Sequence, residues 1–216
     1  MLILYHGHSE FEIRGADGFS LLTDPYDAQV GYPMGSYQMD AVTVSHGHSD
    51  HNDTGKVLGA PAIIDSAGTW YPAPEVKITA IPSFHDEVQG AKRGKNLIMK
   101  IEMEGLTLAH LGDQGAPLTE AQRAALGQVD VLMIPVGGFF TIDAKTAYET
   151  VLSLRPRITI PMHYKTAVNA GWPIADEKEF LRLMGEKDAR PMPLLRVTRG
   201  DLSEQPRLAL LKPEGV

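Results

Sequence analysis

Ser45-His46-Gly47-His48-Ser49-Asp50-His51 comes directly after the apolar run Ala41-Val42-Thr43-Val44. This segment places three imidazoles and one carboxylate within six residues. Imidazoles this close would repel one another if protonated, and the four groups offer more donors than one ordinary hydrogen-bond network needs. The cluster therefore predicts a divalent metal site. The alternative is a polar loop that is rich in His and holds no ligand.

The composition limits which residue types can bind a metal and indicates where in the cell the protein is located. The 216-residue chain is long enough for one sizeable core, and its hydrophobic fraction of 43% is ordinary for a globular protein. It contains no Cys, so a metal must be held by His, Asp or Glu. No apolar run approaches the ~20 residues that span a bilayer, and the N-terminus lacks the basic region of a signal peptide. We expect a cytoplasmic protein with no membrane partner.

The charge of the chain bears on its partners. A net charge of −7 disfavours binding to nucleic acid, because phosphate-driven binding requires a basic face. We therefore expect a small-molecule substrate. The local basic patch Lys92-Arg93-Gly94-Lys95 has two interpretations, a solvated hairpin tip or a lip that attracts an anionic substrate.

Short strands dominate the first two thirds of the chain, and helices follow. Apolar or alternating runs predict strands at 2–5, 11–14, 20–23, 41–45, 62–65, 76–81, 97–103, 106–111, 131–135 and 158–161, with a last edge strand at 206–211. Helices are predicted from Thr119, with a capping box to Gln122, to about 126, and at about 143–154 and 176–184. No linker divides the chain, so we expect one domain, residues 1–216, with packed sheets and outer helices.

Two segments of this pattern resemble each other. They are Asp40-Ala-Val-Thr-Val-Ser45 and Asp130-Val-Leu-Met-Ile-Pro135. Each consists of an acidic residue and a buried strand, followed by a loop that contains Gly. A pseudo-duplicated sheet would explain the likeness.

The spacing within the His-rich segment suits two metal ions. His46 and His48 lie two residues apart as the strand ends, so both side chains can point to the same side. Asp50 and His51 are adjacent, so their side chains diverge and could serve a second ion ~3.5–4 Å from the first. The segment alone therefore supplies donors for a pair of ions.

Three further candidate ligands follow other predicted strands. They are His85, Asp113 and His163. Loops at strand ends are where a rigid sheet presents its ligands. One such donor would more often be structural, but three at equivalent positions favour a shared site.

The order of these motifs resembles that of a known superfamily. His46-Gly-His48-Ser-Asp50-His51, then His85, then Asp113 in Leu-Gly-Asp, then His163 resemble the metal motifs of the metallo-β-lactamase-fold superfamily. A finer likeness is carried by Gly7-His8, Leu22-Thr-Asp24-Pro25, Gly137-Gly-Phe-Phe-Thr-Ile-Asp143 and Ile160-Pro-Met-His-Tyr164. It is similar to the small metal-dependent hydrolase branch related to ascorbate-6-phosphate lactonase.

The resemblance implies a fold, a ligand set and a reaction. The fold is α/β (α+β), a four-layer αββα sandwich with two divalent ions, Zn²⁺ or Mn²⁺, at one edge. The implied ligands are His46, His48 and His85 on one ion, Asp50, His51 and His163 on the other, and Asp113 between them. The implied reaction is hydrolysis of an ester, lactone or phosphoester bond of a small, anionic metabolite, by a hydroxide held between the ions and oriented by the catalytic Asp50. Position 48 is His and not the Glu of the di-iron oxygen-reducing members, which favours hydrolysis over redox chemistry.

Three residues near these motifs have two interpretations each. Asp24 either supports the His-rich loop by hydrogen bonding or simply forms an Asp-Pro turn. His8 either lines the site or is a hydrogen-bonded structural residue. His110 either orients the site from behind the ligands or belongs to the core.

The remaining candidates lie in loops. Tyr164 and Lys165 directly follow a candidate ligand, so they either contact substrate or are a core Tyr and a solvated Lys. Residues 31–39 are interpreted as a surface loop, with a mobile flap over the substrate or a subunit contact as the alternatives.

A second class of function remains open from the residues alone. The chain could be a non-catalytic, metal-stabilised binding or regulatory module on the same fold. The complete ligand set argues against this, because a degenerate module would often have lost Asp50 or a bridging ligand. Loss of hydrolysis in an Asp50→Asn protein that still binds metal would distinguish the enzyme.

Overall fold

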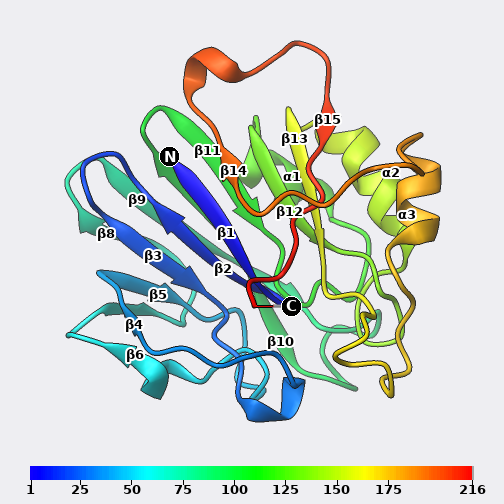
Figure 1. Cartoon of the computed structure of the whole chain (residues 1–216), viewed down its shortest axis with the longest axis horizontal. Coiled ribbons are helices and arrows are strands. Elements are labelled where there is room, and N and C mark those ends of the chain that lie inside the picture. Colours follow the sequence, from blue (N-terminus) through cyan, green and yellow to red (C-terminus); the bar gives the residue numbers. More distant parts are fainter. Residues whose placement is uncertain (216) are drawn as a thin grey trace.

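Two β-sheets lie face to face in the computed structural model, which describes residues 1–215 (Figure 1). The six-stranded sheet has the order β14-β1-β2-β3-β5-β7, formed by Leu195–Arg196, Leu2–Gly7, Glu10–Arg14, Ser20–Thr23, Ala41–Thr43 and Ala62–Ile64. The seven-stranded sheet has the order β15-β13-β12-β11-β10-β9-β8, formed by Arg207–Leu208, Ile158–Met162, Val131–Pro135, Leu106–His110, Lys95–Met103, Val76–Phe84 and Gly68–Ala73.

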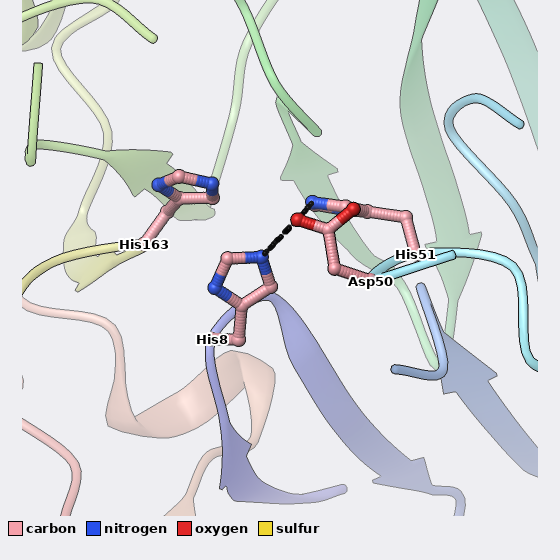
Figure 2. Close-up of side chains that lie close together, drawn as sticks. All are labelled: His8, Asp50, His51 and His163. Atoms are coloured by element: carbon pink, nitrogen blue, oxygen red, sulfur yellow. Dashed lines mark hydrogen bonds and ion pairs between the residues drawn. The ribbon is translucent and has the colours of Figure 1, made fainter. Parts of the chain in front are cut away.

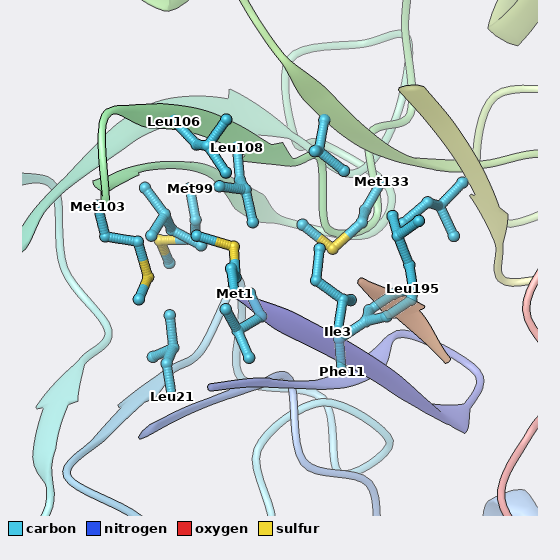
Figure 3. Close-up of a cluster of buried hydrophobic side chains, with 14 of the residues drawn as sticks. Met1, Ile3, Phe11, Leu21, Met99, Met103, Leu106, Leu108, Met133 and Leu195 are labelled. Atoms are coloured by element: carbon cyan, nitrogen blue, oxygen red, sulfur yellow. The ribbon is translucent and has the colours of Figure 1, made fainter. Parts of the chain in front are cut away.

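Alternation of side chains along the strands explains why the sheets pack. Ile3 on β1, Phe11 on β2 and Leu21 on β3 turn to the same face, where they meet Leu108 on β11 and Met133 on β12 (Figure 3). All five are fully buried. Burial of one such side chain stabilises the fold by roughly 1.5–3 kcal/mol. The core of the molecule is therefore the layer between the sheets.

The outer faces of the two sheets are covered differently. The helices α1 (Glu120–Leu126), α2 (Ala144–Leu154) and α3 (Lys178–Leu183) pack on the seven-stranded sheet (Figure 1). The outer face of the six-stranded sheet is covered by a two-stranded sheet, β4 (Tyr37–Gln38) and β6 (Val57–Leu58). Two short 3-10 helices, η1 (Ala28–Val30) and η2 (Thr54–Lys56), lie in the connections that follow β3 and β5, and Val30 of η1 packs with Tyr26 and Tyr32. A further 3-10 helix, η3, spans Arg199–Asp201. The predicted mixed α/β sandwich is confirmed, with one outer layer made of short elements.

The helices begin and end close to the residues that the sequence indicated. Thr119 forms the predicted capping box with Gln122 at the start of α1. Asp143 caps α2 by accepting a hydrogen bond from the Thr146 N–H, and α2 ends at Leu154, before Arg155, which has a positive φ of 49°. The third helix is shorter than predicted, because it starts at Lys178 and not near residue 176.

Most strands match their predicted positions, and the exceptions lie at sheet edges. β6, β8 and β14 were not predicted; β8 is largely exposed and contains Gly68 and Pro72, so it lacks the alternating apolar pattern. β15 spans only Arg207–Leu208 within the predicted 206–211. Residues 31–39, interpreted as a loop, contain β4 near their end.

The two similar segments occupy equivalent places in the two sheets. Asp40 precedes β5, which pairs in parallel with β3 and β7, and Asp130 precedes β12, which pairs in parallel with β11 and β13. Asp40 Oδ2 accepts the Ser20 N–H at 2.8 Å, and Asp130 Oδ2 accepts the Thr107 N–H at 2.9 Å. This shared geometry supports the pseudo-duplicated arrangement. Among residues 1–215, no helix has the length and apolar character required to cross a membrane.

Candidate metal centre

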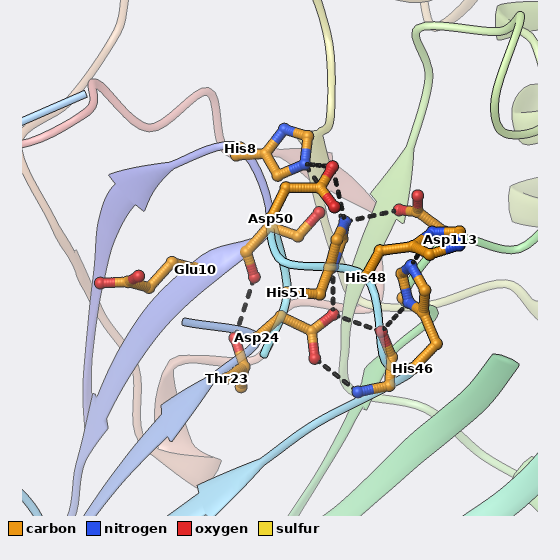
Figure 4. Close-up of polar contacts among 12 residues, drawn as sticks. His8, Glu10, Thr23, Asp24, His46, His48, Asp50, His51 and Asp113 are labelled. Atoms are coloured by element: carbon orange, nitrogen blue, oxygen red, sulfur yellow. Dashed lines mark hydrogen bonds and ion pairs between the residues drawn. The ribbon is translucent and has the colours of Figure 1, made fainter. Parts of the chain in front are cut away.

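The His-rich loop is fastened to the end of the neighbouring strand by Asp24. This fully buried carboxylate accepts the Ser45 N–H at 2.7 Å and the Ser45 hydroxyl at 2.6 Å. Its Oδ2 also lies 2.8 Å from His51 Nδ1 (Figure 4). A carboxylate that is hydrogen-bonded to Nδ1 fixes the tautomer that leaves Nε2 free to bind a metal. The structure therefore places Asp24 where it can orient the loop.

Asp113 lies between imidazoles that come from distant parts of the chain. Its Oδ2 lies 3.0 Å from His85 Nε2 and 3.3 Å from His163 Nε2. Its Oδ1 lies 3.2 Å from His51 Nε2. A carboxylate in this position can contact two neighbouring ions, one through each oxygen.

His8 also reaches this cluster, from the turn between β1 and β2. Its Nε2 lies 3.2 Å from Asp50 Oδ2 and 3.1 Å from His51 Nε2 (Figure 2). Its carbonyl accepts the His163 N–H at 2.8 Å. Both His8 and His163 have positive φ, 55° and 52°, which is strained for residues other than Gly. The fold thus holds both imidazoles in costly backbone positions to bring them together.

The donors form three overlapping groups, each with its ligand atoms within 4.8 Å of one another. The groups are His8, Asp50, His51 and His163; His46, His48 and His85; and His46, His51 and Asp113. The seven predicted ligands are all brought together, and His8 joins them. Imidazole nitrogen and carboxylate oxygen are ligands that zinc and similar divalent ions accept.

Unpaired buried nitrogens indicate that the cluster fits a metal. His163 is 1% exposed, and in the described part of the chain its Nδ1 has no hydrogen-bond partner, while its Nε2, 3.3 Å from Asp113 Oδ2, forms no hydrogen bond of acceptable geometry. Burying a polar nitrogen without a partner costs about 1–3 kcal/mol, which a bound ion would offset. The residues present can therefore hold a divalent metal.

The imidazoles of the cluster are of two kinds, those with a lowered pKa and those with a raised pKa. Burial and the nearby His51 lower the pKa of His46 to about 3, and burial and His163 lower the pKa of His8 to about 4. Burial also acts to lower the pKa of His51, but Asp113 and Asp24 raise it well above its ordinary value. Burial acts to raise the pKa of Asp113, yet His163 and His51 hold it well below its usual range. Ionised carboxylates and neutral imidazoles are the forms that bind a metal.

His110 has no place among the candidate ligands. Its Nε2 lies 2.9 Å from the carbonyl oxygen of Ser9, and its Nδ1 accepts the Gly112 N–H at 3.2 Å. Its Nδ1 also lies 4.0 Å from Asp24 Oδ2. His110 therefore ties the strand that precedes Asp113 to the turn that carries His8.

A cavity of about 390 Å³ opens onto the cluster. Its lining includes five of the candidate ligands and five other residues: His48, Asp50, His85, Asp113, His163, Arg93, Phe140, Gly171, Trp172 and Pro173. Sequence reasoning missed Phe140 and Trp172, which carry no local signal for a binding site. The basic patch contributes Arg93, as its interpretation as a substrate lip required.

Tyr164 and Lys165 do not reach this cavity. Tyr164 is 5% exposed and packs in the apolar layer under the helices. Both residues line a separate hollow with Asp176 and Lys212. The reason is the positive φ of His163, after which the chain turns away and the Lys165 N–H donates to the Ala175 carbonyl.

Comparison with known proteins agrees with this geometry. A family model described as "Beta-lactamase superfamily domain" matches residues 2–163. A UPF0173 metal-dependent hydrolase of Pyrococcus furiosus is 30% identical, over 86% of this chain and 92% of that protein. A relative of the same description from Pyrococcus abyssi is also 30% identical, over the same shares of the two chains.

Solved structures show the same likeness. A metallo-beta-lactamase superfamily protein from Thermotoga maritima, described as Zn-dependent, superposes with a TM-score of 0.80 at 32% identity, over 97% of both chains. A metallo hydrolase from Ignicoccus hospitalis shares the fold, with a TM-score of 0.65 at 22% identity, over 91% of this chain and 99% of that chain. The chain belongs to the metallo-β-lactamase superfamily, in its branch of small metal-dependent hydrolases.

Proposed function

We propose that the protein is a hydrolase with a binuclear metal centre that cleaves an ester, lactone or phosphoester bond of a small molecule. The observation that carries this proposal is the position of Asp113 between His51, His85 and His163. A carboxylate shared by imidazoles of two donor groups suits two ions better than one. Zinc is the metal we favour for this donor set, with manganese as the alternative.

The bound ions would lower the pKa of a coordinated water and stabilise the negative charge that develops on the substrate oxygen. Asp50 would orient that water. This side chain lines the cavity and is one quarter exposed. Burial acts to raise its pKa, but His8 and His51 hold the pKa of Asp50 far below its usual value, so it remains an acceptor. His8 fixes the direction of the carboxylate by its contact with Oδ2.

The cavity limits what can approach this carboxylate. Its volume of about 390 Å³ suits a metabolite, and the rings of Phe140 and Trp172 form part of its wall, with Trp172 5.3 Å from His8 between ring centroids. Apolar walls with a few convergent polar groups are typical of small-molecule sites.

The test combines metal analysis with hydrolysis. Elemental analysis of the purified protein should give about two zinc or manganese ions per chain, and fewer in His46→Ala. The metal-loaded protein is then assayed with phenyl esters, lactones and phosphodiesters. Asp50→Asn keeps one oxygen that can ligate, so it should keep its metal, but it should lose about 100-fold or more in kcat, because it lacks the second, charged acceptor that orients the water.

Two outcomes would contradict the proposal. Activity of Asp50→Asn equal to that of the wild type would exclude the role given to this carboxylate. Full metal occupancy without hydrolysis of any probe would favour the metal-stabilised binding module instead.

A further inference from the structure

Arg93 is the cationic side chain at the mouth of the metal cavity. It lines this cavity with Phe140 and Trp172 and is partly buried. The centre of its guanidinium lies 5.7 Å from the Phe140 ring centroid and 5.9 Å from that of Phe139. These distances allow cation–π contact, which holds the group against the rings.

No carboxylate neutralises this guanidinium. In residues 1–215, Arg14, Arg182 and Arg199 each form an ion pair with Asp or Glu, whereas Arg93 forms none, as is also true of arginines that line no part of this cavity. The neighbouring Lys92 is paired with Glu87 and does not line the cavity. A partly buried cation with no partner, directed at a cavity, is suited to bind an anion from outside the chain.

The backbone around Arg93 is fixed in advance by Asp86. This carboxylate, 1% exposed, accepts four backbone N–H groups. Its Oδ1 accepts those of Val88 at 2.9 Å and Gly90 at 2.7 Å, and its Oδ2 accepts those of Lys92 at 2.9 Å and Arg93 at 2.7 Å. Four hydrogen bonds to one carboxylate hold the turn after His85 in a single conformation. Arg93 therefore sits at a set position relative to a candidate ligand.

Phe139, one of the two rings beside the Arg93 guanidinium, has a strained backbone. Phe139 has a positive φ of 58°, which a bulky residue rarely adopts, and its ring is 61% exposed. Strain of this kind costs about 1–3 kcal/mol and persists where the surroundings enforce it. The fold thus keeps an exposed aromatic ring beside Arg93.

We propose that Arg93 binds an oxyanion of the substrate, a carboxylate or a phosphate, at a point away from the bond that is hydrolysed, while Phe140 and Trp172 contact the apolar body. The proposal rests on the proposed function and names its substrate class. A cation at this point favours the binding of such a substrate to a chain whose net charge is −7.

The experiment uses matched phenyl substrates with the scissile bond that the enzyme accepts. The ring carries a carboxylate, a phosphonate or an uncharged carboxamide of similar size. Arg93→Gln should lower kcat/KM for the charged probes by about 10–100-fold, the loss expected for charge-assisted hydrogen bonds, and change the carboxamide probe by less than about threefold. The ratio between the carboxylate and phosphonate probes identifies the preferred oxyanion.

Two further variants separate a specific contact from general electrostatics and from misfolding. Lys92→Gln removes the same unit of charge one residue away and should leave all three probes unchanged. Arg93→Lys keeps the charge without the planar fork and should recover part of the loss on the charged probes. An equal loss on charged and uncharged probes in Arg93→Gln would overturn the proposal.

The proposal can fail separately from the proposed function. If the wild type hydrolyses the carboxamide probe as well as the charged ones, the hydrolase stands and the anion site is wrong. If it hydrolyses none, binding is read from the quenching of Trp172 fluorescence in a Trp70→Phe background, since the chain has two Trp. Under this proposal 4-hydroxybenzoate binds more tightly than 4-hydroxybenzamide, and Arg93→Gln removes the difference; equal binding would refute it.

Discussion

Replacing Asp24 by Asn should impair the metal centre without touching a candidate ligand. The carboxylate is fully buried and accepts hydrogen bonds from Ser45 with both oxygens. Its Oδ2 also faces His51 Nδ1 at 2.8 Å, while His51 Nε2 faces Asp113 at 3.2 Å. One side of the imidazole is therefore fixed by Asp24 and the other side points to the centre.

The substitution reverses the hydrogen bond that selects the tautomer. Asn keeps one acceptor for the Ser45 N–H, but its amide nitrogen is a donor and requires His51 Nδ1 to accept. The ring proton then moves to Nε2, the atom that a metal would need. The loss of the hydrogen bond at His51 Nδ1 should thus prevent Nε2, on the other side of the ring, from binding a metal.

The expected loss of metal affinity follows from the direct contact of Asp24 with one candidate ligand, His51. Removing such a partner typically costs 10- to 100-fold in metal affinity, equivalent to about 1.4–2.7 kcal/mol. The larger effect should fall on the donor group that contains His51, because Asp24 reaches the group of His46, His48 and His85 only through the Ser45 hydroxyl, which lies 2.9 Å from His46 Nδ1. Loss of charged hydrogen bonds should also lower the unfolding free energy of the metal-free protein by roughly 1.5–3 kcal/mol.

Competition with a chromophoric chelator measures both affinities, and elemental analysis gives the stoichiometry. Asp27→Asn is the matched control, because the Asp27 carboxylate caps η1 and only its backbone N–H, which the substitution keeps, reaches the His-rich loop, at the Ser49 carbonyl. Asp24→Asn should show one weakened site and Asp27→Asn none. Two sites of unchanged affinity in Asp24→Asn would refute the tautomer argument.

Three further predictions follow from the same structure. Because the pKa of His51 is raised in the metal-free protein, a metal must displace its proton. The affinity for metal should therefore fall from about pH 8 to about pH 6, and calorimetry in two buffers should show proton release. A metal affinity that does not change with pH would contradict this. That raised pKa stabilises the metal-free fold fully below the unfolded value of about 6.5, and the contribution is lost as pH rises through the folded value. Gly137→Ala would place a Cβ 2.3 Å from the carbonyl oxygen of His163, so it should displace this imidazole and lower metal affinity about tenfold or more; wild-type affinity in a chelator titration would show that the backbone adapts. Leu108→Ala should reduce the unfolding free energy, measured in urea, by about 2–5 kcal/mol and leave the metal content normal, because Leu108 lies between the sheets. Loss of metal at unchanged stability would contradict this prediction.

The donors of the centre could be predicted from sequence because their signal is local. Four of them lie within His46–His51, and the others directly follow strands whose apolar runs are easily recognised. His8 was placed near the site only by resemblance, since a single His after β1 has no distinctive spacing. The structure shows why it matters, because its carbonyl and ring both face His163.

The walls of the cavity could not be predicted, because they depend on how distant loops meet. Arg93, Phe140 and Trp172 are far apart in sequence and converge only after the sheets have packed. Adjacency to a ligand was a poor guide, as Tyr164 shows, because one residue with positive φ redirects the chain. The edge strand β8 was missed for a related reason, since its exposed residues carry no apolar alternation.

The candidate ligands come from both sheets, and this gives a bound metal a second effect. The His46–His51 loop continues β5 of one sheet, whereas His85, Asp113 and His163 follow β9, β11 and β13 of the other. Elsewhere the sheets are joined mainly by apolar contacts, so an ion at this edge acts as a cross-link between two halves of the chain. An ion present at 100 times its Kd stabilises the native state by about 2.7 kcal/mol. Metal supply would then govern how long each molecule survives proteolysis, as well as how fast it works.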